Sequence, residues 1–173
     1  MTDTTTLEIP GYKQGTWVLD PSHSEVTFTV RHMMISKVRG TFGMKSATLV
    51  APENPFEATV EAYVATWNET DVARRQARIA QAWADSGRYR DPLMGSTGHG
   101  EIDAMLSAVQ ARFPGFVLKR TSKVDCHNDA VRFTWSLGPA SGPSVVEGVD
   151  FGTLTPEGKL ATIVGFIDKM PAA

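Results

Sequence analysis

YVATWNETDVARRQARIAQAWADSGRYRDP, residues 63–92, is the stretch that decides the fold of this chain. A buried helical stripe runs into it, because apolar residues recur at i, i+4, i+7, i+8 and i+11. Tyr63 lies on that stripe, so its hydroxyl points inward and needs a hydrogen-bond partner there. At the other end, Asp91 precedes a proline, which favours an extended backbone. The pattern leaves two interpretations of Asp91 open, a base in a pocket or a loop aspartate.

The composition excludes several classes of protein. The 173 residues carry a formal charge of -2, so there is no basic excess for a nucleic-acid backbone. The single Cys126 has no partner for a disulfide or a cysteine metal site, and we expect no metal and no cofactor. No apolar run approaches the roughly 20 residues of a membrane span. Because the N-terminus also lacks the pattern of a secretory signal, we expect a cytoplasmic protein without membrane insertion.

The first third of the chain predicts β-structure after a polar tail, residues 1–14. Val26, Phe28 and Val30 alternate with polar residues, which is typical of a strand with one buried face. We predict an antiparallel meander, closed by Pro52 and Pro55. Its four strands are Thr16–Asp20, Glu25–His32, Lys37–Phe42 and Ser46–Ala51.

From Phe56 the apolar period changes from two to about 3.6 residues. The pattern predicts a helix to Asn68, a second helix capped by Asp71 and running through Ala84, and a third helix ending at Phe113. On the second helix we expect Val72, Ile79 and Trp83 to point inward and Arg74, Arg75 and Arg78 to be solvated, and we expect a loop at residues 93–100.

The remainder of the chain alternates again and predicts four more strands. A curved antiparallel sheet over three helices encloses a cone-like interior, so the predicted fold class is α+β. The expected strands are Phe116–Val124, Val131–Leu137, Val145–Leu154 and Leu160–Asp168.

Residues 15 to about 60 resemble the opening of a YceI-like protein. The runs that carry the resemblance are DPSHS and VRHMM followed by KVRGTF. That family forms an antiparallel β-barrel around an isoprenoid or similar lipid tail. The resemblance stops near Glu61, where a family member would need about twice as many strands to close its barrel.

From about Phe56 to the end, the chain resembles the SnoaL-like members of the nuclear-transport-factor-2-like superfamily, of the polyketide cyclase and ketosteroid isomerase type. The matching pieces include YVATWNETD, WADSGRYRDP and VVEGVDFGTL. The chain therefore looks like a fusion of a YceI-like β-meander fragment, 15–55, with a SnoaL-like cone domain, 56–173. The resemblance implies a homodimer. We also expect the orphan N-terminal strands to pair with a partner chain or with the neighbouring sheet.

Ketosteroid isomerases of this superfamily suggest the site residues. Matching the motifs places the hydrogen-bond-donating tyrosine on Tyr63, the proton-shuttling base on Asp91 and the protonated acid donor on Asp150. A cyclase would use a histidine–acid pair, for which His99 with Asp91 is the candidate, although His99 also fits a solvated position near a helix start. An epoxide hydrolase would need Arg132 between Asp91 and Asp150, a weaker match.

The cone is the concavity that the pattern supplies, so we expect it to bind a small apolar ligand. Three alternatives stay open: enolisation chemistry on a small carbonyl compound, as in an isomerase or cyclase; sequestration of a lipid, isoprenoid or polyketide without turnover; and a fusion whose own extra strands occlude the pocket. The aromatic side chains expected to line the cone are Trp67, Trp83, Phe133, Trp135 and Phe166.

Overall fold

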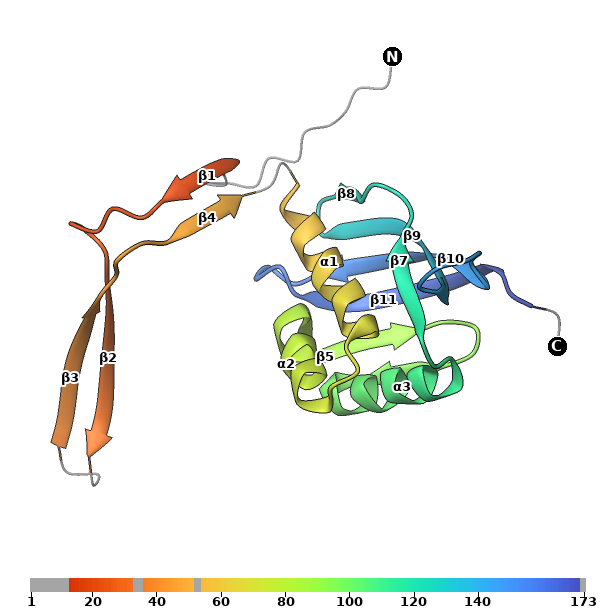
Figure 1. The fold of residues 1–173 in the computed structure, drawn as a ribbon, viewed down its shortest axis with the longest axis horizontal. Helices are drawn as coiled ribbons and strands as arrows, with labels where there is room; N and C mark the ends of the chain where they lie inside the picture. The colour runs from red at the N-terminus through yellow and green to blue at the C-terminus, as the bar shows by residue number, and fades with distance from the viewer. Residues whose placement is uncertain (1–12, 33–35, 52–53, 172–173) are drawn as a thin grey trace, which may run out of the picture. The chain divides into compact units, whose positions relative to one another are not determined.

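The computed structural model describes residues 13–32, 36–51 and 54–171, which form two units that we treat separately (Figure 1). Most of the predicted polar tail, residues 1–12, lies outside these ranges. No helix within them is long and apolar enough to cross a membrane. The cytoplasmic location stays a prediction.

The N-terminal unit is built from two antiparallel strand pairs. β1 (Gly15–Val18) pairs with β4 (Thr48–Ala51), and β2 (Glu25–His32) pairs with β3 (Ser36–Gly43). The predicted meander is wrong in its order, because the partner of the first strand is the fourth strand. The inner hairpin brings β4 back alongside β1.

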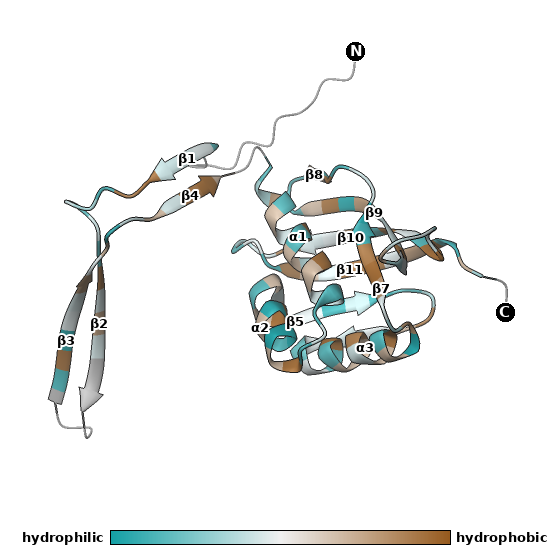
Figure 2. Ribbon diagram, viewed as in Figure 1, coloured by the Kyte–Doolittle hydropathy of each residue, from teal (hydrophilic) through white to brown (hydrophobic). Residues whose placement is uncertain are grey.

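Hydrophobic and hydrophilic residues alternate along β3, as expected for a strand with one apolar face (Figure 2). The register places Val26 opposite Phe42 and Phe28 opposite Gly40. The rings of Phe28 and Phe42 stack with centroids 5.1 Å apart, and Phe28 lies over the bare backbone of Gly40. Even so, Phe42 remains 63% exposed. Two strands alone lack the second layer that buries a sheet face.

The second unit begins with two helices whose caps are visible in the sequence. Asn54 accepts a hydrogen bond from the Phe56 amide at the start of α1 (Pro55–Asn68). Asp71 accepts one from the Arg74 amide at the start of α2 (Val72–Ala82), which confirms the predicted cap. α3 (Gly98–Arg112) is the third helix of the described chain.

The sheet of this unit curls around the three helices (Figure 1). Its strands follow the order β6-β5-β11-β10-β9-β7, with β8 paired to β9. All pairs are antiparallel except β5 with β11, which is parallel and departs from the fully antiparallel sheet expected. The strands are β5 (Trp83–Arg90), β6 (Gly95–Thr97), β7 (Phe116–Arg120), β8 (Asp125–His127), β9 (Ala130–Pro139), β10 (Val146–Leu154) and β11 (Leu160–Lys169).

Four local predictions for this unit need correction. Val72, expected to point inward, is 54% exposed at the first position of α2. The second helix ends at Ala82, and Trp83 starts β5, although its side chain is buried as expected. The expected loop at 93–100 contains β6, which pairs with β5, and the first turn of α3. Arg75 is 2% exposed rather than solvated, because its Nε donates to Asp103 Oδ1 on α3 at 2.7 Å.

The core lies between the helices and the concave face of the sheet. Val60 and Ile79 are fully buried, on α1 and α2, and they pack in one cluster with Leu160 and Ile163 of β11. Tyr63 belongs to the same cluster, with edge-on contacts to the rings of Trp67, Trp83 and Phe133. The fold therefore holds Tyr63 rigidly from three sides.

Helix α2 supplies a matched pair for testing this packing. We expect Ile79→Ala to lower the free energy of unfolding by about 2–5 kcal/mol, because it leaves a cavity in the core. Val72→Ala, at a position on the same helix that is 54% exposed, is expected to change it by less than about 1 kcal/mol. Urea unfolding monitored by circular dichroism compares the two, and equal losses would contradict this placement of α2.

Candidate functional site

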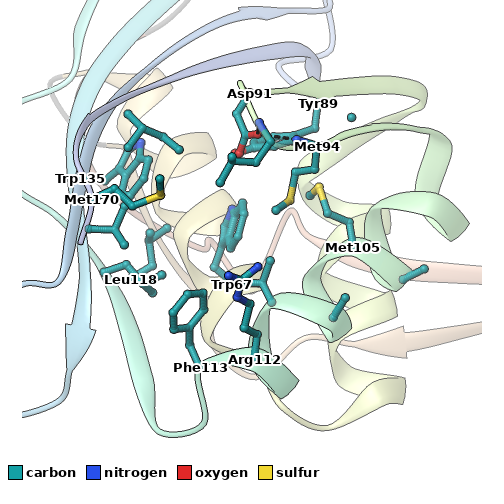
Figure 3. A pocket seen from close by; sticks show the side chains of 18 of the residues that line it. Trp67, Tyr89, Asp91, Met94, Met105, Arg112, Phe113, Leu118, Trp135 and Met170 are labelled. Atoms are coloured by element: carbon teal, nitrogen blue, oxygen red, sulfur yellow. Dashed lines mark hydrogen bonds between the residues drawn. The ribbon is translucent and has the colours of Figure 1, made fainter. Parts of the chain in front are cut away.

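A cavity of about 720 Å³ opens between α3 and the concave face of the sheet (Figure 3). Most of its wall is apolar, and its few polar side chains include Tyr63, Tyr89 and Asp91. A large apolar pocket with a few convergent polar groups is the usual form of a small-molecule site. The other lining residues are Trp67, Leu93, Met94, Gly95, Glu101, Ala104, Met105, Ala108, Val109, Arg112, Phe113, Leu118, Trp135, Leu137, Val146, Ile167 and Met170.

Helix α3 forms one long side of this cavity. Its lining residues occur at i, i+3, i+4, i+7, i+8 and i+11 from Glu101, which is a single stripe of the helix. Ala104 and Ala108 lie within the stripe, and their short side chains leave room beside the helix. Ile102 and Leu106 face the core instead. α3 therefore separates the core from the cavity with two different apolar faces.

Asp150 sits behind the cavity wall, 1% exposed, at the middle of β10. The hydroxyl of Tyr63 donates to its Oδ2 at 2.6 Å, and the indole Nε1 of Trp135 donates to its Oδ1 at 2.8 Å. Both donors also line the cavity. Asp150 accordingly reaches the cavity through Tyr63 and Trp135, as a hydrogen-bond acceptor, and not as the direct donor that we expected from the resemblance.

Burial governs the protonation of this pair. Loss of solvent raises the pKa of Asp150 to about 6, against the two hydrogen bonds from Tyr63 and Trp135, which lower it. Burial also raises the pKa of Tyr63 well above its ordinary value, and the nearby Asp150 adds to that effect. Near neutral pH the tyrosine is protonated and the aspartate is mostly ionised.

Asp91 lies on the cavity wall, just past the end of β5. Its Oδ1 accepts hydrogen bonds from the amides of Leu93 and Met94, both at 2.7 Å, which orient the carboxylate in a tight turn. Its Oδ2 accepts a hydrogen bond from the hydroxyl of Tyr89 at 2.9 Å. The two open interpretations of Asp91 are therefore compatible, because it is a loop aspartate that faces a pocket.

Tyr89 is a site residue that our sequence reasoning missed. It is 3% exposed on β5, and burial raises the pKa of its hydroxyl. A signal was present, because Arg88 and Arg90 flank it in a strand and both are exposed, so the alternation turns Tyr89 inward.

The two aspartates meet over Gly165 of β11. A Cβ atom built on Gly165 would lie 3.0 Å from Asp150 Oδ1, 3.3 Å from Asp91 Cβ and 3.4 Å from the Tyr89 hydroxyl oxygen. The register explains this crowding, since Gly165 pairs with Asp150 on β10. A glycine here lets the two tyrosine–aspartate pairs approach each other across the strand.

The five aromatic residues expected to line the cone divide into three groups. Trp67 and Trp135 lie on the cavity wall. Trp83 and Phe133 are 1% exposed and pack against the ring of Tyr63, behind the wall. The expectation for Phe166 is wrong, because it pairs with Val149 on the outer face of the sheet and is 55% exposed.

The structure also separates His99 and Arg132 from Asp91. His99 Nε2 lies 3.1 Å from the carbonyl oxygen of Trp83, at the opposite end of β5 from Asp91. Arg132 is exposed and donates to Asp125 at 2.9 Å. Neither the histidine–acid pair nor the Asp-Arg-Asp arrangement is therefore formed. Within the described ranges, no cluster of three or more histidine, cysteine or acidic residues is placed to hold a metal ion.

A family model for the YceI-like domain matches residues 17–107, more than half of the chain. The match begins in the N-terminal strands and continues into α3 of the second unit. A comparison with curated protein sequences finds no match.

Solved structures resemble the second unit. A SnoaL-like protein from Agrobacterium tumefaciens with a provisional isomerase assignment is 38% identical, with a TM-score of 0.63, over 65% of this chain and 97% of that one. A SnoaL-like protein from Jannaschia, provisionally a polyketide cyclase, is 19% identical, with a TM-score of 0.51, over 66% of this chain and 89% of that one. A protein with a cystatin-like fold from Methylobium petroleophilum is 16% identical, with a TM-score of 0.54, over 68% of this chain and 78% of that one. The last two likenesses concern the fold alone.

The raised pKa of Asp150 predicts a pH dependence of stability. Between its unfolded value of 3.8 and about 6, the folded chain holds this proton more tightly than the unfolded chain does. The stability contributed by the group is complete below about pH 4 and is lost as the pH rises to about 6, up to about 3 kcal/mol.

Asp150→Asn removes this titration and leaves the side chain nearly the same size. We expect the free energy of unfolding of the wild type, relative to the variant, to fall by up to about 3 kcal/mol between pH 4 and pH 7. Urea unfolding at several pH values measures the difference. Parallel pH profiles for the two proteins would show that Asp150 is not a buried titrating group.

Proposed function

Because this chain belongs to the YceI-like family over residues 17–107 and to the SnoaL-like family through its cone-shaped unit, we propose that the cone binds a small apolar carbonyl compound and catalyses its enolisation, as an isomerase or cyclase would. The observation that carries this proposal is the pairing of two aspartates with two tyrosines beside a mostly apolar cavity. Similarity of fold supports membership of the family, whereas the reaction has to be argued from the residues of the site.

Asp91 is the base in this proposal. Enolisation requires a carboxylate that removes a proton from carbon next to a carbonyl group, within hydrogen-bond reach of the substrate. Asp91 faces the cavity, and the amides of Leu93 and Met94 together with the Tyr89 hydroxyl hold it in one orientation. These three donors occupy part of the carboxylate's accepting capacity, which leaves a further lone pair on Oδ2 for the substrate proton.

Tyr63 donates to the developing enolate oxygen, and Asp150 is a positioning residue behind it. A tyrosine hydroxyl has a single proton, and while Asp150 is ionised that proton is donated in the hydrogen bond to its carboxylate. When Asp150 is protonated, it donates to the Tyr63 oxygen, and the tyrosine proton turns toward the cavity. Turnover should therefore increase as the pH falls toward 6 and Asp150 becomes protonated.

A second candidate is a binding module that sequesters an apolar lipid, isoprenoid or polyketide. The hydrogen bonds of the resting site favour it, since both tyrosine hydroxyls donate to aspartates and the remaining wall is mostly apolar. Such a module would bind ligand with the same affinity whether or not residue 91 carried a charge. Turnover therefore distinguishes the two candidates.

We expect Asp91→Asn to lower turnover of a β,γ-unsaturated ketone by at least about 100-fold, because the amide cannot accept the carbon-bound proton. Ligand affinity should change little. Ultraviolet absorbance of the conjugated product measures the rate, and fluorescence of Trp67 and Trp135, which line the cavity, reports binding.

The matched control is Asp85→Asn, at a position on the same strand whose side chain is 99% exposed. It should leave both rate and affinity unchanged. Wild-type binding without any turnover would reject the enolisation proposal and support the binding module. Absence of binding would reject both.

We also propose that the cone-shaped unit forms a homodimer through the outer face of its sheet. Val149, Phe151, Val164 and Phe166 lie together on β10 and β11, and the last is more than half exposed. A contiguous exposed apolar face of this kind marks an association surface. The N-terminal strands are proposed to pair between the two chains, since β2 and β3 each have one edge that no described strand pairs with.

Phe166→Glu tests the dimer, because it places two buried charges opposite each other at a twofold interface. We expect the dimer dissociation constant from analytical ultracentrifugation to rise at least about tenfold. Leu93→Glu, at an exposed apolar position away from the sheet face, serves as the control. A wild type that sediments as a monomer would contradict the proposal. Deletion of residues 1–53 weakens the dimer further only if the N-terminal strands take part.

A further inference from the structure

The charges that line the cavity are distributed unevenly. Two lining residues are acidic: Asp91, just past the end of β5, and Glu101, in the first turn of α3, where it accepts a hydrogen bond from the Thr97 amide. Arg112 is the one basic residue among the described lining residues, and it ends α3. At 1.5 Å per residue, the 11 steps from Glu101 to Arg112 span about 16 Å. Glu101 and Arg112 therefore lie at opposite ends of the α3 side of the cavity.

Arg112 has no carboxylate partner in the part of the chain that the structure describes. Its guanidinium carbon lies 5.6 Å from the ring centre of Phe113, and its side chain makes no hydrogen bond or ion pair with any described residue. Figure 3 shows Arg112 and Phe113 on one side of the cavity, Asp91 and Tyr89 on the other, and Trp67 between them. None of the five donors of the guanidinium is taken up by a residue of the described ranges.

We propose that Arg112 anchors the carboxylate of an elongated, otherwise apolar ligand, and that it thereby decides which substrates enter productively. This inference rests on the proposed function, whose substrate class it narrows to apolar carboxylic acids with a carbonyl group remote from the acid. Arginine suits this role because its planar fork matches a carboxylate with two parallel hydrogen bonds.

The acidic lining residues reinforce one orientation of such a ligand. A carboxylate placed beside Asp91 and Glu101 would meet like charges, whereas the same group at Arg112 meets an opposite charge. The apolar body then lies along Ala104, Met105 and Ala108 of α3. Its far end, which carries the reacting carbonyl, reaches Tyr63 and Asp91. Anchoring at one end thus sets the position of the chemistry at the other.

A different role for Arg112 makes a different prediction. A cation at the C-terminal end of a helix is stabilised by the helix dipole, so Arg112 would then act on the stability of α3 alone. In that case its replacement changes the free energy of unfolding and leaves the discrimination between charged and neutral ligands as it was. Ligand selectivity is therefore the informative measurement.

Three probes of one chain length separate charge from apolar contact: decanoate, methyl decanoate and decyltrimethylammonium. Quenching of Trp67 and Trp135 fluorescence in the full-length protein measures the dissociation constant of each. We expect decanoate to bind the wild type most tightly, and Arg112→Gln to weaken it roughly five- to tenfold, a moderate loss because the arginine is partly solvated. The dissociation constant of methyl decanoate should differ by less than about twofold between the wild type and Arg112→Gln.

Two further variants complete the test. Arg112→Lys keeps the charge but not the fork, and should recover part of the decanoate affinity. Arg88→Gln removes an exposed arginine from the same unit, outside the cavity, and should leave every constant unchanged. The decanoate constant should also weaken with added salt, while the ester constant should not.

The outcomes separate this inference from the function on which it rests. If methyl decanoate binds the wild type as tightly as decanoate does, or if Arg112→Gln weakens both equally, the anchor is rejected and the apolar pocket stands. If none of the three probes binds, the apolar pocket of the proposed function fails and the anchor fails with it.

Discussion

The buried carboxyl group of Asp150 is the constraint on which the cone-shaped unit depends. A carboxylate removed from water costs several kcal/mol unless hydrogen-bond donors replace its hydration. Here the donors are Tyr63 of α1 and Trp135 of β9, so a single side chain on β10 ties a helix and a neighbouring strand together. Misplacing either element would leave a buried charge without a partner. The same two donors form part of the cavity wall. The hydrogen bonds that hold the core together therefore also set the polarity of the site.

The remaining geometry follows from that arrangement. Because Asp150 and Gly165 are register partners, the space above Gly165 is where the β10 aspartate approaches Asp91 and Tyr89. The parallel pairing of β5 with β11 delivers Tyr89 to this point, since Tyr89 pairs with Ile163. Tyr89 and Asp91 thus come to the site from β5, next to the edge strand β6, and Asp150 comes from the middle of the sheet. The apolar stripe of α3 closes the opposite side and gives the cavity its length.

The N-terminal unit follows a different physical rule. Its strands pair well, yet their apolar residues stay largely exposed, as Trp17, Val38 and Phe42 show. After β4 the chain continues into the helices of the second unit. A two-stranded ribbon is only marginally stable alone, so its stability depends on a further layer of protein packing against its apolar face.

The sequence by itself determined the helices, the alternating strands and the fold class, because hydrophobic periodicity and capping residues are local signals. Asp71 and the stripe through Tyr63 are examples. The tertiary structure alone decided which strands are neighbours, that β1 pairs with β4, and that β5 runs parallel to β11. It also decided the burial of single side chains. Arg75 is buried because it donates to Asp103 on α3, 28 positions away in the sequence. Phe166 is exposed because it lies, paired with Val149, on the outer face of the sheet. Polar partners in a core come from distant segments, and no local pattern of residues specifies them.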